Sequence, residues 1–204
     1  MDSNSLVDRL DFEEGALLLV DKPSGWTSFD VVNKLRYALR SKLGIKKIKV
    51  GHSGTLDPLA TGLLIICTGK ATKKINDLMG LDKKYSGEIT LGASTPSYDK
   101  ETEPDEYFET SYLTESSILK AVLELKGEQM QVPPMYSAIK IDGQPLYKKA
   151  RKGKTIEVPA RPVTIYDFEI KEFELPLIKF EVHCSKGTYI RSLAHDLGKN
   201  LQNG

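Results

Sequence analysis

The sequence is poor in the residue types that build disulfide frameworks and metal centres. It holds two cysteines and three histidines among 204 residues. Cys67 and Cys184 both lie in apolar stretches, which is typical of buried free thiols in a reducing compartment. His52, His183 and His195 lack the spacing of metal ligands, and neither cysteine sits in a Cys-x-x-Cys motif. We therefore expect neither a disulfide nor a metal site.

Long apolar runs are also missing. No stretch approaches the roughly 20 apolar residues that span a bilayer. The first residues, MDSNSLVDRLDFEEG, are acidic and lack the pattern of a signal peptide. Together with the free cysteines, these features predict a soluble cytoplasmic protein that has no membrane partner.

Two common catalytic motifs do not occur. The stretch GHSGTLDPLATG at residues 51–62 is rich in glycine, but it does not match the phosphate-binding pattern GxxxxGK[ST]. No GxSxG nucleophile elbow is present. Nucleotide hydrolysis is therefore disfavoured, whereas counting residues alone leaves a Ser-His-Asp triad open.

Charge is balanced overall but segregated along the chain. There are 29 Lys and Arg against 28 Asp and Glu, a net charge of +1, which argues neither for nor against a nucleic-acid partner. Basic residues cluster in SKLGIKKIKV, GKATKK and YKKARKGK, and acidic residues cluster between Asp99 and Glu109. Each run alone is better explained as a solvated surface, but segregated charge can still present a positive face to phosphates.

Apolar periodicity and turn residues predict an α+β fold. Strands are predicted over 15–20, 47–50, 63–68, 83–92, 163–174 and 177–185, and helices over 27–43, 71–79, 114–127 and 188–201. The strands do not alternate strictly with helices, which favours one domain over residues 1–204 with a mixed, mostly antiparallel sheet flanked by helices.

The helix predicted over 27–43 has the clearest local signals. Thr27 and Asp30 have the spacing of a capping box. One apolar stripe is formed by Phe29, Val32, Leu35 and Leu39.

Two segments stand outside this regular pattern. Residues 94–110 are polar and lack periodicity, so we expect an exposed loop there, for which the sequence indicates no role. About residues 132–162, here called the basic insertion, contain five prolines, an Asp-Gly turn and the densest basic cluster. We expect a hairpin-like excursion from the core.

Asp57 is the central candidate for chemistry, and its local pattern has a simple structural explanation. An aspartate before a proline in a glycine-rich loop favours a turn in which the carboxylate bonds its own backbone. Ser53, Thr55 and Thr61 have the same explanation, and Arg191 is compatible with an ordinary helix arginine.

Five stretches, taken together, resemble the TruB family of tRNA pseudouridine synthases. GHSGTLDPLATGLLIICTGKATK is similar to the family signature, and LLLVDKPSGWTSFDVVNKLR to its N-terminal motif. KKYSGEITLGASTPSYD resembles the strand with the active-site tyrosine, and CSKGTYIRSLAHDLG the motif with the active-site arginine. QVPPMYSAIKIDGQPLYKKARKG resembles the RNA-gripping insertion. The five occur in the family's order and cover most of residues 16–198.

The resemblance implies the pseudouridine synthase fold and the isomerisation of the T-loop uridine of tRNA, position 55, to pseudouridine. No atoms are gained or lost, so no cofactor and no metal is expected. The implied catalytic residues are Asp57 as the catalytic carboxylate, Arg191 as its guanidinium partner and Tyr85 as the ring that stacks on the target base. The carboxylate can attack covalently or stabilise an electron-poor sugar carbon, and attack at the ribose or at the base stays open.

The resemblance also implies RNA-binding residues. His52 would take the place of the flipped base, Tyr189 would line the same pocket, and Lys22 would support the active-site loop. The basic insertion would close over the T-stem-loop, and its phosphate contacts would come from Lys148, Lys149, Arg151, Lys152 and Lys154.

Two alternatives stay open beside the stand-alone tRNA enzyme. One is a guide-RNA-dependent pseudouridine synthase, and the other is a tRNA-binding or RNA-folding chaperone. We expect a monomer with tRNA as its partner. The family's C-terminal segment or small RNA-binding module is expected to be absent from this chain.

Overall fold

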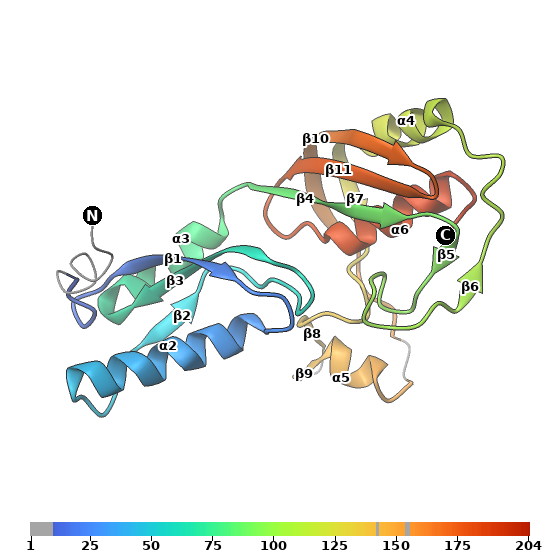
Figure 1. The fold of residues 1–204 in the computed structure, drawn as a ribbon. Helices are drawn as coiled ribbons and strands as arrows, with labels where there is room; N and C mark the ends of the chain where they lie inside the picture. Colours follow the sequence, from blue (N-terminus) through green and yellow to red (C-terminus); the bar gives the residue numbers. More distant parts are fainter. Residues whose placement is uncertain (1–9, 142, 154–155) are drawn as a thin grey trace. The chain divides into compact units, whose positions relative to one another are not determined.

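The structure is a computed structural model that describes residues 10–141, 143–153 and 156–204. The chain divides into two compact units (Figure 1), of which the first ends at Leu81 and the second runs from Asp82 to Gly204. Each unit has a hydrophobic core of its own. The single catalytic domain over residues 1–204 stays a prediction.

The first unit contains a three-stranded antiparallel sheet. Strand β3 (Gly62–Thr68) lies between β1 (Leu17–Lys22) and β2 (Val50–His52). Helix α2 (Ser28–Leu43) follows β1, and its apolar side shares a core with the sheet through Val32. The 3-10 helix η1 (Gly69–Lys74) and helix α3 (Ile75–Met79) follow β3.

Helix α2 begins at the predicted capping box. The Thr27 hydroxyl accepts from the Asp30 N–H at 3.1 Å, and the Asp30 carboxylate accepts from the Thr27 N–H at 2.9 Å. The helix ends at Gly44, whose φ of +66° favours glycine. The predicted stripe is partly wrong, because Phe29 is 60% exposed. The buried side chains are Ser28, Val31, Val32 and Leu39, which follow helical spacing.

The second unit contains a four-stranded sheet in the order β4-β11-β10-β7, in which every pair is antiparallel. Its strands are β4 (Lys83–Thr90), β7 (Gly127–Gln131), β10 (Arg161–Glu174) and β11 (Leu177–Cys184). Helices α4 (Glu115–Glu124) and α6 (Ile190–Asn200) contribute to the same core (Figure 1). The predicted α+β class with a mostly antiparallel sheet is confirmed.

One face of this sheet is apolar and the other is charged. Ile178, Phe180 and Val182 alternate along β11 and are buried in a core that includes Leu193 and other residues of α4 and α6. Between these positions, side chains of the opposite face form surface ion pairs, for example Lys171 Nζ with Glu181 at 3.0 Å. The alternation explains how the polar strands still bury a continuous core.

Both irregular segments contain regular elements among the residues that the structure describes. Residues 94–110 are mostly exposed or half-exposed, as expected, but Ser97 is fully buried. Strand β5 (Ala93–Ser94) pairs there with β6 (Glu106–Tyr107). The basic insertion contains a hairpin of β8 (Lys140–Ile141) and β9 (Gln144–Pro145), followed by helix α5 (Leu146–Ala150).

We predict that Ile178→Ala destabilises the second unit by about 2–5 kcal/mol, because the side chain is fully buried in the central strand β11 and its removal leaves a cavity. Urea unfolding followed by circular dichroism measures this change. Leu119→Ala on α4 serves as the control, because Leu119 is 49% exposed and should cost about 0.5 kcal/mol or less. Equal effects would contradict the assigned core.

Candidate active site

The loop that carries Asp57, residues 53–61, is held by the end of β1 and the start of α2. The Leu56 N–H donates to Ser28 Oγ at 2.9 Å, and the Ser28 hydroxyl donates to the Leu56 carbonyl at 3.2 Å. The carbonyl of Pro58 accepts from Lys22 Nζ at 3.2 Å. Asp57 is half-buried and lies between two residues with anchored backbones, so its position is well defined.

Lys22 is the fully buried cation of this arrangement. Its ammonium group donates to the carbonyl oxygens of Pro23 at 3.0 Å, Trp26 at 2.6 Å and Pro58 at 3.2 Å. Burial lowers the pKa of Lys22, and the nearby carboxylates of Asp57 and Asp30 oppose that shift. All three N–H donors of the ammonium are used, so the geometry favours support of the loop over a direct contact with RNA.

His52 ends β2, immediately before the Asp57 loop. The ring is half-buried, and its Nδ1 donates to the carbonyl of Gly54 at 2.5 Å. Gly54 has a φ of +132°, a conformation that side chains rarely adopt. The bond restrains the ring and leaves Nε2 as its other polar edge.

Arg191 belongs to the second unit and is the second residue of α6. Its side chain is 12% exposed. Nη1 donates to the Ser97 carbonyl at 2.9 Å, Nη2 donates to the Tyr136 carbonyl at 3.0 Å, and Nε lies 3.5 Å from Asp99 Oδ2. The guanidinium is thus oriented by two segments of its own unit, the turn at residues 97–99 and the segment that contains Tyr136. Its pairing with Asp57, which belongs to the first unit, stays a prediction.

Asp99 is the residue at this site that sequence reasoning missed. Its Oδ1 accepts from the Ser97 hydroxyl at 2.6 Å and from the Glu101 N–H at 2.9 Å. Ser97 Oγ also lies 2.7 Å from Thr102 Oγ1. Oδ1 therefore fixes the turn while Oδ2 faces Arg191. The only sequence signal is the hydroxyl-rich stretch STPSYD, which indicates a turn and gives no partner.

Tyr98 occupies an unusual backbone conformation within this turn. Its φ is +61°, which costs free energy for a bulky side chain. The ring stacks on His195, with centroids 3.8 Å apart and planes at 10°. Burial raises the pKa of Tyr98 and lowers the pKa of His195, so both rings are neutral at neutral pH. Because His195 lies one helical turn after Arg191, the stack joins the strained turn to the same helix.

The two predicted pocket tyrosines lie on regular elements of the second unit. Tyr85, on β4, is half-buried against the core. Tyr189 precedes α6, and its N–H donates to Gln131 Oε1 at 2.8 Å while its carbonyl accepts from Gln131 Nε2 at 3.1 Å. Gln131 is buried, so β7 fixes the start of the helix that carries Arg191. The contacts of both tyrosines with RNA stay predictions.

Four of the predicted phosphate-binding cations of the basic insertion lie on α5 or directly after it. Lys148, Arg151 and Lys152 are exposed, and Lys149 is half-buried. The Arg151 guanidinium lies 5.6 Å from the centroid of the Tyr147 ring. Lys154 lies outside the described residues. Lys148, Arg151 and Lys152 are therefore accessible to the phosphates of an RNA.

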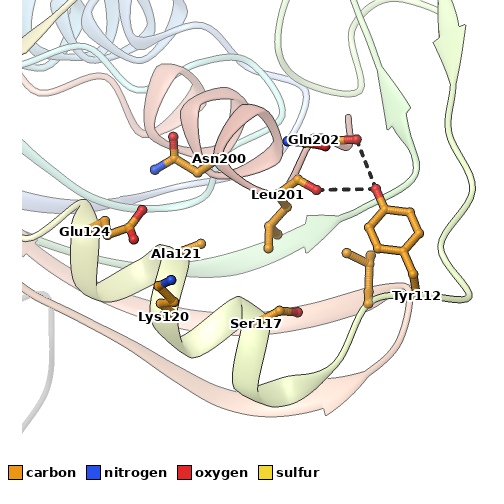
Figure 2. A pocket seen from close by; sticks show the side chains of 9 residues that line it. Tyr112, Ser117, Lys120, Ala121, Glu124, Asn200, Leu201 and Gln202 are labelled. Atoms are coloured by element: carbon orange, nitrogen blue, oxygen red, sulfur yellow. Dashed lines mark hydrogen bonds between the residues drawn. The ribbon is translucent and has the colours of Figure 1, made fainter.

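A pocket of about 240 Å³ lies between α4 and the end of α6 (Figure 2). The Tyr112 hydroxyl at its rim lies 3.0 Å from the Gln202 carbonyl and 3.3 Å from the Leu201 carbonyl. None of the predicted site residues that the structure describes lines this pocket. The pocket therefore stands apart from the candidate active site.

Two properties of the described residues bear on the expected absences. No helix in the described ranges is long and apolar enough to cross a membrane. The same residues contain no group of three or more His, Cys, Asp or Glu side chains placed to hold a metal ion. The absence of a metal and of a cofactor stays a prediction.

Solved structures define the class of protein. The chain is similar to a chain in the crystal structure of a Cbf5-Nop10-Gar1 complex, with 29% identity, a TM-score of 0.65 and coverage of 93% of this chain and 45% of that chain. It is also similar to a chain of an H/ACA RNP bound to a substrate RNA containing 2'-deoxyuridine, with 26% identity, a TM-score of 0.62 and coverage of 93% and 44%. The chain spans less than half the length of these chains. The predicted pseudouridine synthase fold is confirmed.

The chain belongs to the TruB family. A family model described as TruB family pseudouridylate synthase (N terminal domain) matches residues 40–190. The tRNA pseudouridine synthase B of Flavobacterium johnsoniae is 55% identical over 195 residues, which cover 95% of this chain and 85% of the relative. The protein of the same name from Phocaeicola vulgatus is 51% identical over 195 residues, covering 96% and 83%. The predicted family is confirmed.

We predict that Lys22→Met destabilises the first unit by about 2–4 kcal/mol, because it removes the donor from three carbonyl oxygens around the Asp57 loop. Thermal or urea unfolding measures the loss. Lys34→Met on the exposed side of α2 is the matched control and should change stability by about 0.5 kcal/mol or less. A Lys22→Met protein as stable as the control would contradict the anchoring role.

We predict that Asp99→Asn slows pseudouridine formation about 10- to 100-fold, because Arg191, the predicted partner of Asp57, loses its own charged partner, and a small misplacement of a group that acts in catalysis is costly. Single-turnover rates measure the effect, and RNA affinity should change little. Glu103→Gln changes the same charge at an exposed position of the same segment and should leave the rate within about twofold. Equal rates for the two variants would contradict a role of Asp99 in positioning Arg191.

Proposed function

We propose that this protein is a tRNA pseudouridine synthase, an isomerase that converts the T-loop uridine at position 55 to pseudouridine with Asp57 as its catalytic carboxylate. Membership of the TruB family carries the proposal, since the relatives at 46–55% identity bear the name tRNA pseudouridine synthase B. The anchored loop around Asp57 supports it from the structure.

The chemistry requires a carboxylate of fixed position. Breaking the glycosidic bond makes the ribose electron-poor, and an ionised carboxylate can stabilise that centre or bond to it. Asp57 suits this role because the residues on both sides of it are hydrogen-bonded through their backbone. A carboxylate that must not move gains from such preorganisation.

Arg191 and Tyr85 complete the proposed catalytic set. A guanidinium can bind a carboxylate through two parallel hydrogen bonds and favours its ionised form. The bonds of Arg191 to Ser97, Tyr136 and Asp99 hold it ready for that partner. Tyr85 supplies a ring for stacking on the uracil and a hydroxyl for proton transfer.

RNA binding is proposed to combine base replacement with phosphate contacts. The target uridine must leave the folded T-loop before it reacts, and the restrained ring of His52 would occupy its place. Tyr189 would line the pocket. The basic insertion would contact the T-stem-loop through Lys148, Lys149, Arg151, Lys152 and Lys154. We further propose that the protein acts as a cytoplasmic monomer, without metal or cofactor.

The relatives favour this proposal over a guide-dependent synthase. Curated relatives named tRNA pseudouridine synthase B reach 55% identity, whereas the matched chains from H/ACA ribonucleoproteins share 26–29%. Turnover on tRNA in the absence of any guide RNA is the observation that separates the two. RNA folding without catalysis is separated by whether turnover depends on Asp57.

We predict that Asp57→Asn lowers pseudouridine formation by at least about 1,000-fold while tRNA affinity changes little, because the amide cannot act as an anionic catalyst. An unmodified tRNA transcript is incubated with each protein, and pseudouridine is mapped by chemical derivatisation. Asp77→Asn, at an exposed position of α3, is the matched control and should keep full activity.

Two results would overturn the proposal. If the wild-type protein leaves position 55 of the transcript unmodified under conditions in which it binds the tRNA, the substrate assignment fails. If Asp57→Asn retains turnover, the carboxylate serves only its own loop.

A further inference from the structure

A basic groove of about 520 Å³ lies on the first unit, between the C-terminal half of α2 and residues 46–49. Its lining consists of Ile48 and five cations, which are Arg36, Arg40, Lys46, Lys47 and Lys49. None of them belongs to the Asp57 loop or to the basic insertion. Arg40, Lys46, Lys47 and Lys49 are exposed, as the prediction of a solvated surface expects, and they also line a concavity of one charge sign.

The floor of this groove is rigid. The Arg36 guanidinium donates to Asn33 Oδ1 at 2.7 Å and to the Val50 carbonyl at 3.1 Å. Ile48 packs on the core of the first unit. The Lys49 carbonyl accepts from the Gly69 N–H at 2.9 Å. The backbone around the groove is held from several sides, so its cations project from a fixed frame.

The turn at the end of α2 brings the two sides of the groove together. Gly44, with a φ of +66°, reverses the chain, and its N–H donates to the Arg40 carbonyl. The Ile45 N–H donates to the same carbonyl at 3.2 Å. The side chain of Arg40 consequently faces the same concavity as those of Lys46, Lys47 and Lys49.

Among the described residues, the exposed cations of the groove have no acidic partner. Across the part of the chain that the structure describes, Arg40, Lys46, Lys47 and Lys49 form no ion pair with a carboxylate. Lysines elsewhere are paired, for example Lys70 with Glu14 at 2.7 Å. Like charges in one groove repel each other, and a bound polyanion relieves that repulsion.

We propose that this groove binds the sugar–phosphate backbone of the tRNA substrate, as a contact separate from the catalytic loop. The inference rests on the proposed function for the identity of the RNA. An RNA strand offers successive phosphates to the five cations. Arginine and lysine contacts to phosphates supply affinity and orientation without reading sequence. Five of the six lining residues end in a positive charge, which favours a polyanion as the partner.

The test compares two triple variants of equal charge change. The groove variant is Arg40→Gln/Lys46→Gln/Lys47→Gln. The control is Lys120→Gln/Lys171→Gln/Lys179→Gln, which removes two exposed cations of the second unit and the half-buried Lys179. Affinity for unmodified tRNA is measured over a series of KCl concentrations, in the Asp57→Asn background so that no turnover occurs. Circular dichroism and unfolding curves check that both variants fold like their parent.

The slope of log affinity against log salt reports the phosphate contacts. Each lost contact reduces its magnitude by roughly 0.7–0.9, so we expect the groove variant to lose about 2–3 from the slope and about tenfold or more in affinity. The control should stay within about twofold of its parent, because long-range charge alone is screened by salt. A folded groove variant with an unchanged slope would overturn the inference, as would equal losses in both variants.

Two further arms separate this inference from its alternatives. If the groove variant loses binding to phosphatidylserine vesicles but keeps its tRNA slope, the groove serves a membrane surface and the inference is wrong.

Turnover by the wild-type protein decides the proposed function independently. If the wild-type protein isomerises tRNA and the groove variant binds tRNA normally, the groove inference is wrong and the proposed function stands. A wild-type protein without turnover, beside a groove variant with a reduced slope, leaves the RNA-binding groove standing and defeats the proposed reaction.

Discussion

The ammonium group of Lys22 is the interaction on which the first unit's candidate site depends. An unpaired buried charge is costly, and here the cost is offset by three carbonyl acceptors from the chain after β1 and from the Asp57 loop. The same bonds satisfy carbonyl oxygens that irregular backbone would otherwise leave unpaired. One side chain therefore fixes the path of two loops, and Asp57 lies within the second of them.

The second unit solves a similar problem for Arg191. Its guanidinium is mostly buried, so its donors must be matched by acceptors, and the turn around Asp99 supplies both a carbonyl and a carboxylate. That turn is held by Ser97 and by the stack of Tyr98 on His195. The strained backbone of Tyr98 is maintained because the hydrogen bonds of Ser97 and Asp99 and the stack on His195 together offset its cost.

Local signals were sufficient for much of the fold, whereas the site residues follow from the family resemblance. The capping box at Thr27 and the alternating strands 163–174 and 177–185 depend on neighbours in the sequence, and the structure confirms them. Strand β7 was missed because GEQMQ is mostly polar and becomes a strand by pairing with β10. Phe29 was assigned to the wrong side of α2, because composition does not give the direction in which the helix faces.

The partnership of Asp99 with Arg191 joins residues far apart in the chain, and no local pattern encodes it. Asp57 itself was chosen through the family resemblance, since its local pattern favoured a simple turn.

The hydrogen bond from Arg191 to the Tyr136 carbonyl has a consequence for how substrate is sensed. Tyr136 lies in the basic insertion, so the segment proposed to grip RNA is mechanically continuous with the guanidinium proposed to orient the catalytic carboxylate. A displacement of that segment changes the bonding of Arg191, and by thermodynamic linkage the arrangement of Arg191 changes the free energy of the displacement by the same amount. RNA held by the basic insertion would therefore act on Arg191 through the backbone at Tyr136.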